Sequence, residues 1–328
     1  MMIYYLLTED CNLRCSHCIR GKSVKQYMDY SSAVRGLEQI YKLYPDTSLV
    51  LSGGEPTLHP RFSDLLQKAS EKFKAVVINS NGTTPFWRKN HSIINRNNVI
   101  VQFSLDGLQD YHDKIRGLGS FDKTSDSIRF INGLGKPIWI STVVSRKNMK
   151  SVMRLSEILA QFNIEKWHVS PLMPFGNASA DDVPDVNEWN NFVDELINIT
   201  PFRLGIRKLF ATDILEKLSD EQISQIAESE RNADFKNCGC VKSKLYIYPD
   251  MTVYGCTCMK DIPLGNLETQ SLSEILNGTV AQSFLSYVCE VSACKQCRYF
   301  KICNGGCMGM QKKYGYDTRC PLINKLHR

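Results

Sequence analysis

The sequence contains no long apolar run. No stretch of about 18 consecutive apolar side chains occurs among its 328 residues, so we expect no membrane-spanning helix. The first residues, Met1 to Leu7, form a short apolar run with no basic residues before it, unlike a secretion signal. Basic runs and aromatic–basic stripes are also missing, which argues against nucleic acid as a partner despite the formal net charge of +6. We therefore expect a cytoplasmic protein that binds neither a membrane nor nucleic acid.

Cysteine, by contrast, is abundant, and the chain has 13. Without a secretion signal, so many cysteines indicate metal chemistry in a reducing compartment rather than disulfides. The first three, Cys11, Cys15 and Cys18, share one short loop that offers no fourth cysteine. A closed structural metal site needs four ligands, whereas a four-iron, four-sulfur cluster held by three thiolates leaves one iron open to a small molecule. The alternatives for this loop are a zinc knuckle and buried free thiols.

The first two-thirds of the chain alternate between strand and helix patterns. Short apolar runs rich in β-branched residues are separated by segments with apolar residues at helical spacing, such as Val34, Leu37 and Tyr41. This alternation predicts an α/β fold in which helices cover a parallel sheet. Six strand–helix units are too few for a closed eight-stranded barrel. The expected strands are 3–8, 48–52, 75–80, 99–104, 138–144 and 166–169.

Polar motifs follow several of these strands, at the end where parallel sheets place their chemistry. Ser52-Gly53-Gly54-Glu55-Pro56 follows the second strand, and its two glycines allow a close backbone approach to a ligand. Asn79 to Thr83 follows the third strand, and Ser104-Leu105-Asp106-Gly107 follows the fourth. Further along, Arg116 offers a planar guanidinium that suits a carboxylate. Taken alone, a glycine-rich or Asn-Gly motif is also typical of an ordinary turn.

Together these motifs resemble those of the radical S-adenosylmethionine (SAM) enzymes, namely CxxxCxxC, GGEP and SLDG…HDxxR. The resemblance implies a partial (β/α)6 TIM-type barrel over residues 1–173. It also implies a [4Fe-4S] cluster with one open iron on Cys11, Cys15 and Cys18, where bound SAM is cleaved to a 5′-deoxyadenosyl radical. The SAM-binding residues that it implies are Gly53, Gly54, Glu55, Ser80, Asn81, Ser104, Arg116, His17 and Leu172. We expect Asp106 and His112 to brace the loop rather than to catalyse.

Residues 174–236 contain no cysteine and are expected to form a helical bridge, with its clearest helices at 185–200 and 211–230. The segment 237–328 then holds ten cysteines. Their closing series, Cys294-x2-Cys297-x5-Cys303-x3-Cys307 with Cys320 after a gap, resembles the SPASM extension of radical SAM enzymes. A zinc ribbon is the rival interpretation, because paired cysteines are common zinc ligands.

The SPASM resemblance implies a small, cysteine-rich and loop-rich domain with two auxiliary [4Fe-4S] clusters. No role is assigned to Cys289. The implied ligands are Cys294, Cys297, Cys303 and Cys320 for one cluster, and Cys307, Cys240, Cys256 and either Cys238 or Cys258 for the other.

The resemblance also bears on function, because SPASM members mostly modify peptides and proteins. We expect a maturase that installs a crosslink or similar modification in a ribosomally made precursor peptide. A reductant such as flavodoxin or ferredoxin would serve it. Because the chain begins on the first expected strand, any leader-binding domain would be separate or unnecessary. Thr257 replaces the aspartate of sulfatase-maturing members, so we expect no formylglycine formation. His168, at the end of the sixth strand, is a candidate substrate contact or catalytic residue.

Two alternatives stay open at this point. One is a radical SAM dehydrogenase or rearrangement enzyme that acts on a small metabolite. The other is a non-catalytic protein in which all the cysteines bind structural metal, and this reading leaves Glu55, Ser104 and Arg116 without a reason to be polar.

Overall fold

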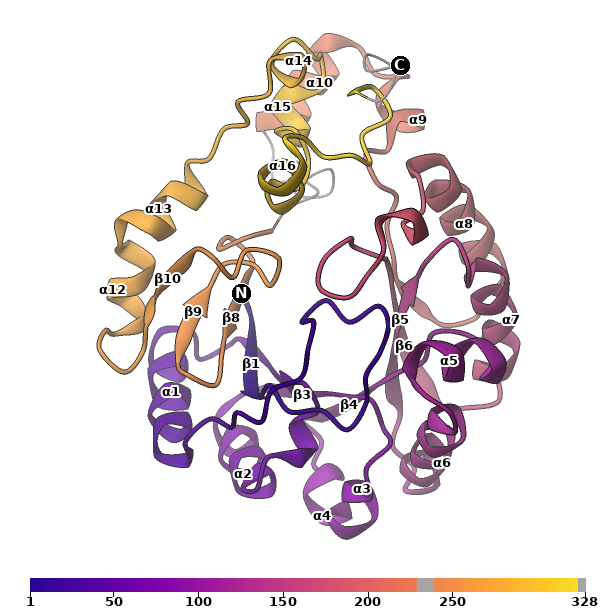
Figure 1. The fold of residues 1–328 in the computed structure, drawn as a ribbon, viewed down its shortest axis with the longest axis vertical. Coiled ribbons are helices and arrows are strands. Elements are labelled where there is room, and N and C mark those ends of the chain that lie inside the picture. Colours follow the sequence, from indigo (N-terminus) through magenta and orange to yellow (C-terminus); the bar gives the residue numbers. More distant parts are fainter. Residues whose placement is uncertain (229–238, 324–328) are drawn as a thin grey trace.

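The fold is built on one curved sheet with helices around its outer side (Figure 1). The computed structural model describes residues 1–228 and 239–323. The sheet has ten strands in the order β10-β9-β8-β1-β2-β3-β4-β5-β6-β7. The strands are β1 (Met2–Thr8), β2 (Ser48–Gly53), β3 (Ala75–Ser80), β4 (Val99–Ser104), β5 (Ile138–Val144), β6 (Ile164–Pro171), β7 (Arg203–Gly205), β8 (Lys244–Ile247), β9 (Thr252–Tyr254) and β10 (Pro263–Asn266).

The six expected strands are all present as β1 to β6, in chain order and parallel, so the partial barrel is confirmed. The sheet extends beyond it on both sides. β7, inside the segment expected to be helical, pairs in parallel with β6. β8 pairs in parallel with β1, and β9 and β10 continue the sheet in antiparallel fashion. The cysteine-rich segment therefore begins as a continuation of the barrel sheet, and the boundaries at 173 and 236 stay predictions.

Helices cover the outer face of this sheet (Figure 1). They are α1 (Tyr30–Leu43), α2 (Phe62–Lys72), α3 (Phe86–Lys89), α4 (His91–Ile94), α5 (Gln109–Arg116), α6 (Ser120–Gly133), α7 (Met149–Leu159) and α8 (Val186–Ile199). β4 shows how alternation sorts the two faces. Val99, Val101 and Phe103 are buried, whereas the residues between them, including Gln102 and Ser104, are partly exposed. The outer face thus forms the core, and the inner face is left open for ligands.

The helix expected over residues 211–230 is interrupted. It divides into α9 (Thr212–Leu215) and α10 (Asp220–Glu228), and residues 229 and 230 lie outside the described part of the chain. The side chain of Ser219 accepts from the backbone N–H of Gln222 (3.2 Å), and the side chain of Gln222 accepts from that of Ser219 (2.9 Å). This reciprocal capping begins a new helix, so the segment expected to be helical contains two helices rather than one.

The remaining helices belong to the C-terminal part. They are α12 (Leu272–Asn277), α13 (Thr279–Leu285), α14 (Ser292–Lys295), α15 (Phe300–Cys303) and α16 (Met308–Tyr314). Two short 3-10 turns, Pro56–Leu58 and Ala180–Asp182, complete the fold. α14 to α16 lie across the ring from α2 to α4, at the top of Figure 1. In the described ranges, no helix is both long and apolar enough to cross a membrane.

Candidate active site

The cysteine loop lies at the carboxyl ends of the barrel strands. It leaves β1 after Thr8, and the backbone N–H of Ser16 donates to the carbonyl of Ile115 (3.0 Å) at the end of α5. Cys11, Cys15 and Cys18 are partly buried and line one cleft of about 350 Å³. The loop therefore presents all three thiols to the same space.

These thiols suit a cluster better than a single metal ion. Burial raises the pKa of Cys11 to about 11, and burial also raises the pKa of Cys15 although Arg116 opposes it. Metal binding must therefore displace protons from them. Within residues 1–228 and 239–323, no three His, Cys, Asp or Glu side chains converge as a single ion requires. A cubane binds thiolates at separate corners, so its ligands need not converge on one point, and the zinc knuckle gains no support.

Gly53 and Gly54 hold the end of β2 against the start of the cysteine loop. The backbone N–H of Gly54 donates to the carbonyl of Thr8 (2.7 Å). The backbone N–H of Glu55 donates to the carbonyl of Asp10 (2.8 Å). A side chain at Gly54 would place its Cβ 2.2 Å from the carbonyl oxygen of Asp10. This close approach requires glycine. The GGEP turn and the cysteine loop are thus locked together at one edge of the cleft.

Glu55 is fully buried behind the wall of the cleft. Its carboxylate accepts four hydrogen bonds, from the backbone N–H and hydroxyl of Thr57 (3.2 and 2.6 Å), the hydroxyl of Ser80 (2.8 Å) and the backbone N–H of Asn81 (2.8 Å). Burial raises the pKa of Glu55, and these hydrogen bonds oppose the rise. In this structure the side chain ties the ends of β2 and β3 together, and it is not part of the cleft lining.

Glu55→Gln is expected to lower the free energy of unfolding by about 1–3 kcal/mol, because an amide keeps only one acceptor oxygen for these four donors. Urea unfolding of the purified protein measures the change. Glu157→Gln, at an exposed position of α7, is the matched control and should stay within about 0.5 kcal/mol of the unmodified protein. Equal unfolding midpoints for the two variants would contradict the role assigned to Glu55.

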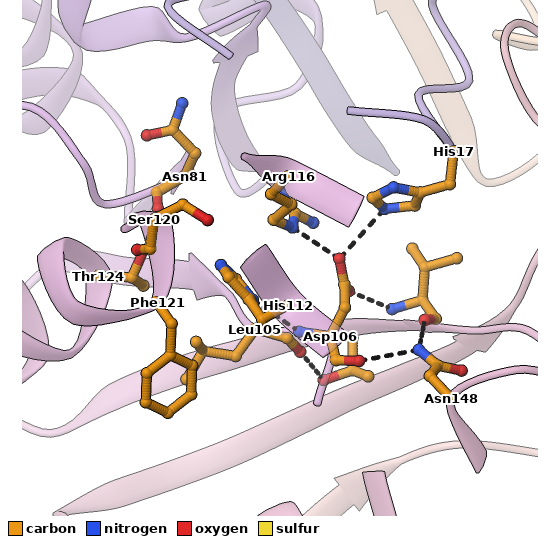
Figure 2. A network of polar contacts seen from close by, with 12 residues as sticks. His17, Asn81, Leu105, Asp106, His112, Arg116, Ser120, Phe121, Thr124 and Asn148 are labelled. Carbon is orange, nitrogen blue, oxygen red and sulfur yellow. Dashed lines mark hydrogen bonds and ion pairs between the residues drawn. The ribbon is translucent and has the colours of Figure 1, made fainter. Parts of the chain in front are cut away.

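Asp106 lies at the centre of a buried polar network (Figure 2). One of its carboxylate oxygens accepts from Nε of Arg116 (2.6 Å) and lies 3.2 Å from Nε2 of His17. The other accepts from the backbone N–H of Val143 (2.9 Å). Burial opposes ionisation, yet Arg116 and His17 hold the pKa of Asp106 well below its usual range. The ionised carboxylate therefore joins the cysteine loop to the end of α5 and to β5.

The backbone of Asp106 is also fixed. Its N–H donates to Nδ1 of His112 (3.2 Å), and its carbonyl accepts from the side-chain amide of Asn148 (2.9 Å). Burial and the charge of Arg116 lower the pKa of His112 to about 4, so this ring is neutral at pH 7. These contacts match the bracing role expected for Asp106 and His112.

Arg116 and His17, the two side chains paired with Asp106, both line the cleft. Asp106 engages Nε of Arg116, and in the described part of the chain nothing accepts from the two terminal nitrogens of this guanidinium, which lines the cleft. Nδ1 of His17 is buried and has no hydrogen-bond partner among the described residues. One carboxylate thus positions two polar groups that are free to meet an anionic, hydrogen-bonding ligand.

The other predicted SAM contacts gather at the same place. Every predicted contact apart from Glu55 lines the cleft, which brings together Gly53, Gly54, Ser80, Asn81, Ser104, Arg116, His17 and Leu172. Their individual roles stay predictions. Sequence reasoning missed Arg20, which also lines the cleft and whose Nη1 is buried without a partner among the described residues. The one feature of the sequence that could have indicated this residue is its position two residues after Cys18.

A second, larger cavity of about 700 Å³ adjoins the cleft. The two share Ile19, Ser170, Pro171 and Met173 as wall residues, so they are continuous at the carboxyl end of β6. Side chains from the inner face of the sheet form much of the remaining wall. The barrel interior therefore offers room for a substrate beside the presumed SAM position.

His168 lines this second cavity. Its ring centroid lies 5.3 Å from that of Trp139 on the neighbouring strand. Burial, followed by the charges of nearby cations, lowers the pKa of His168 to about 4. The ring is therefore neutral at pH 7, and its role as a substrate contact stays a prediction.

Four C-terminal cysteines also line this cavity, namely Cys240, Cys256, Cys258 and Cys307. Hydrogen bonds from Cys240 and Cys258 lower the pKa of Cys256 to about 3, so the Cys256 sulfur contacts each of the other two. Cys307 lies close enough to Cys258 to interact with it electrostatically. This arrangement favours Cys258 as the fourth ligand of the auxiliary cluster expected on Cys240, Cys256 and Cys307. The other candidate, Cys238, lies outside the described residues.

The remaining cysteines form a second group. Burial raises the pKa of Cys303 to about 11, with Cys297 and Cys320 near it. Burial and contact with Cys289 raise the pKa of Cys294 to about 12. The four predicted ligands of the second auxiliary cluster thus share one neighbourhood. Cys289, to which the sequence assigned no role, lies fully buried among them.

Comparison with known proteins recognises both parts of the chain. Residues 5–159 match the family model of the radical SAM superfamily, and residues 238–298 match SPASM, an iron-sulfur cluster-binding domain. A cysteine-type anaerobic sulfatase-maturating enzyme of Clostridium novyi is 24% identical over 92% of this chain and 85% of its own length. The mycofactocin maturase MftC of Mycobacterium tuberculosis is 25% identical over 96% of this chain and 79% of its own.

A solved structure confirms the likeness of fold. The crystal structure of Streptococcus suis SuiB bound to the precursor peptide SuiA aligns with a TM-score of 0.81 at 18% identity. The alignment covers 98% of this chain and 75% of that one.

Proposed function

The chain belongs to the radical SAM superfamily and carries a C-terminal SPASM domain, and from this premise we propose that it installs a crosslink or similar modification in a ribosomally made precursor peptide. As a member of this superfamily it uses SAM and a [4Fe-4S] cluster, and its SPASM domain binds auxiliary [4Fe-4S] clusters. When bound and reduced, the cluster would supply the electron for the reductive cleavage of SAM, and so the means of removing hydrogen from a substrate. Cys11, Cys15 and Cys18 would hold this cluster.

The chain's own residues bind and orient. The terminal nitrogens of Arg116 are free to pair with the SAM carboxylate, and the bond from Nε to Asp106 fixes the plane of the guanidinium. The turn at Gly53 and Gly54 brings backbone groups to the opposite edge of the cleft. Because the cleft adjoins the large cavity, a substrate in that cavity lies within reach of the SAM ribose.

The observation that carries the proposal is this continuity between the SAM cleft and the auxiliary cysteines. The 700 Å³ cavity has wall residues in common with the cleft, and Cys256, Cys258 and Cys307 form another part of its wall. A substrate bound there would touch both redox sites. Such a volume holds several amino-acid side chains, and pockets for drug-sized ligands are of about 300–1,000 Å³.

The names of the relatives support a peptide substrate. MftC is described as a maturase, and the SuiB structure contains a precursor peptide. A haem synthase of Nitratidesulfovibrio vulgaris is also among the relatives, so a small molecule is the competing substrate class. A separate leader-binding protein and a flavodoxin or ferredoxin reductant are part of the proposal.

Anaerobic co-expression with short open reading frames that neighbour the gene tests the proposal. Mass spectrometry is expected to find one peptide that has lost two hydrogens for each crosslink and that resists backbone fragmentation between the joined residues. The triple variant Cys11→Ala, Cys15→Ala and Cys18→Ala should leave that peptide unmodified. Unmodified peptides throughout, together with turnover of a porphyrin or another small molecule by the purified enzyme, would overturn it.

A sulfatase-derived peptide provides a specificity control. Thr257 lies in the cavity wall, and its hydroxyl is 3.2 Å from the hydroxyl of Tyr248. Because a threonine hydroxyl is not a base at neutral pH, we expect no conversion of this peptide to formylglycine. Detection of the formylglycine mass would show that the cavity processes sulfatases after all.

A further inference from the structure

Basic side chains gather at the amino ends of the strands, from both sides of the barrel. Lys166 on β6 lies opposite Arg203 on β7 in the register of the sheet. Lys244 is the first residue of β8, on the far side of β1. His168 interacts electrostatically with all three, so they form one group in space. We call Lys166, His168, Arg203 and Lys244 the basic mouth.

The basic mouth faces the large cavity. Lys244 and His168 line it directly. Nζ of Lys166 lies over the ring of Trp139, 5.1 Å from its centroid, and this ring is another part of the wall. Arg203 lies on the same face of β7 as Gly205, because side chains alternate along a strand, and Gly205 lines the cavity too.

Gly205 is required by this packing. A Cβ at this position would lie 2.6 Å from Nδ1 of His168. The glycine therefore leaves room for the imidazole between β6 and β7 and keeps the inner face open beside the lysines.

Among the described residues, no carboxylate neutralises this group inside the cavity. The described residues that line the cavity include no aspartate or glutamate. Within the described ranges, Lys166, Arg203 and Lys244 take part in no ion pair. Glu165 interacts electrostatically with Lys166 and with Lys136. Because side chains alternate along a strand, Glu165 lies on the opposite face of β6 from Lys166.

Like charges that lie close together repel one another, and a charge that is also partly buried loses solvation. Arg203 and Lys244 are exposed, whereas Lys166 is partly buried. Both effects act on Lys166, because burial and the charge of Arg203 lower its pKa and so disfavour its charged form. An anionic ligand would relieve the repulsion and gain charge-assisted hydrogen bonds.

We infer that the basic mouth binds a carboxylate of the peptide substrate, from an aspartate or glutamate side chain in the segment that enters the barrel. The inference rests on the proposed function and adds a substrate class to it. The aromatic side chains Trp139, Tyr4 and Tyr246 on the same inner face would contact the apolar parts of that segment. A C-terminal carboxylate has the same chemistry, and the test separates the two sources.

The test uses a library of short random peptides in two forms, with free and with amidated C-termini. The cluster-loaded enzyme with SAM retains peptides anaerobically, and sequencing reads the retained set. We expect aspartate and glutamate to be enriched in both forms at low salt, with the enrichment falling as salt rises. Enrichment that disappears in the amidated form would overturn the side-chain assignment in favour of the terminus.

Charge reversal provides the decisive comparison. The double variant Lys166→Glu and Lys244→Glu is expected to bind a selected acidic peptide about tenfold more weakly or worse, and to lose the preference for acidic residues. Lys123→Glu, at an exposed position in the first turns of α6, reverses a charge away from the mouth and should keep affinity and preference. Iron and sulfide contents confirm that each variant is loaded.

The outcomes separate this inference from the proposed function. Acidic peptides that bind but are never modified would support the mouth and refute the maturase. Peptides that are modified without any acidic preference would support the maturase and refute the mouth. Should the double variant fail to fold, the wild-type preference and its salt dependence decide the matter, because an unchanged composition of the retained set overturns the inference.

Discussion

Asp106→Asn is expected to lower the free energy of unfolding by about 3–5 kcal/mol, because it leaves the buried guanidinium of Arg116 without its counter-charge. The wild-type carboxylate is fully buried. It pairs with Arg116 and His17 and accepts a hydrogen bond from the backbone N–H of Val143. Its folded pKa lies well below the usual 3.8. The stabilisation that the ionised Asp106 provides is therefore complete above its unfolded pKa of about 3.8. It is lost as the pH falls from there through the lower pKa of the folded protein.

The same substitution should weaken SAM binding, because Arg116 loses the partner that orients it. We expect the Kd for SAM to rise about tenfold, the equivalent of one hydrogen bond to a charged group at about 1.5 kcal/mol. Urea unfolding at pH 7 and equilibrium dialysis with SAM measure the two effects. Asp110→Asn, at an exposed position in the first turn of the same helix, is the control and should alter neither. An Asp106→Asn protein with the stability of this control would contradict the network in Figure 2.

Removal of iron by a chelator is expected to unfold α10 and α14 to α16 while β1 to β6 stay folded. The barrel has a continuous core that begins at β1 and also includes buried residues of β8 to β10, α12 and α13. α10 and α14 to α16 pack instead on small groups of buried residues, the largest of which is Leu215, Ile223, Tyr299 and Ile302. Two other groups have only three buried residues each, and both contain cysteine. In small domains that need metal to fold, bound metal supplies on the order of 10 kcal/mol.

Hydrogen exchange read by mass spectrometry, with and without iron, tests this division. Peptides from residues 292–314 should exchange much faster after chelation, whereas peptides from β1 to β6 should exchange at the same rate. β8 is the internal control, because it is C-terminal in sequence yet pairs with β1 in the barrel sheet. Unchanged protection of α14 to α16 after complete iron removal would show that the clusters do not order this part of the chain.

The strands were predictable because parallel strands buried under helices appear as short β-branched runs. β1 to β6 lie where these runs predicted them, within three residues at either end. β7 was missed, because three residues with a glycine and an arginine give no periodic signal. The pairing of β8 with β1 joins residues about 240 positions apart in the chain. The order of apolar and polar residues within a short window cannot indicate a contact between segments so far apart.

The candidate site shows a similar division. Motif spacing predicted which side chains would meet in the cleft, since parallel strands align their carboxyl ends. It did not predict that Glu55 faces Ser80 and Asn81 behind the cleft wall, because burial depends on how β2 and β3 pack. Nor did it show that Asp106 connects His17 with Arg116, since this contact is made by side chains from separate segments.

Cys11, Cys15 and Cys18 are expected to hold a cluster on which SAM is reductively cleaved. Anaerobic reconstitution with iron and sulfide, followed by SAM and dithionite, tests it most directly through the yield of 5′-deoxyadenosine. We expect this product from the wild-type protein and none above background from the Cys11→Ala, Cys15→Ala and Cys18→Ala variant, which keeps its auxiliary cysteines. A fully loaded wild-type protein that forms no 5′-deoxyadenosine, or a triple variant that forms as much as the wild type, would contradict it.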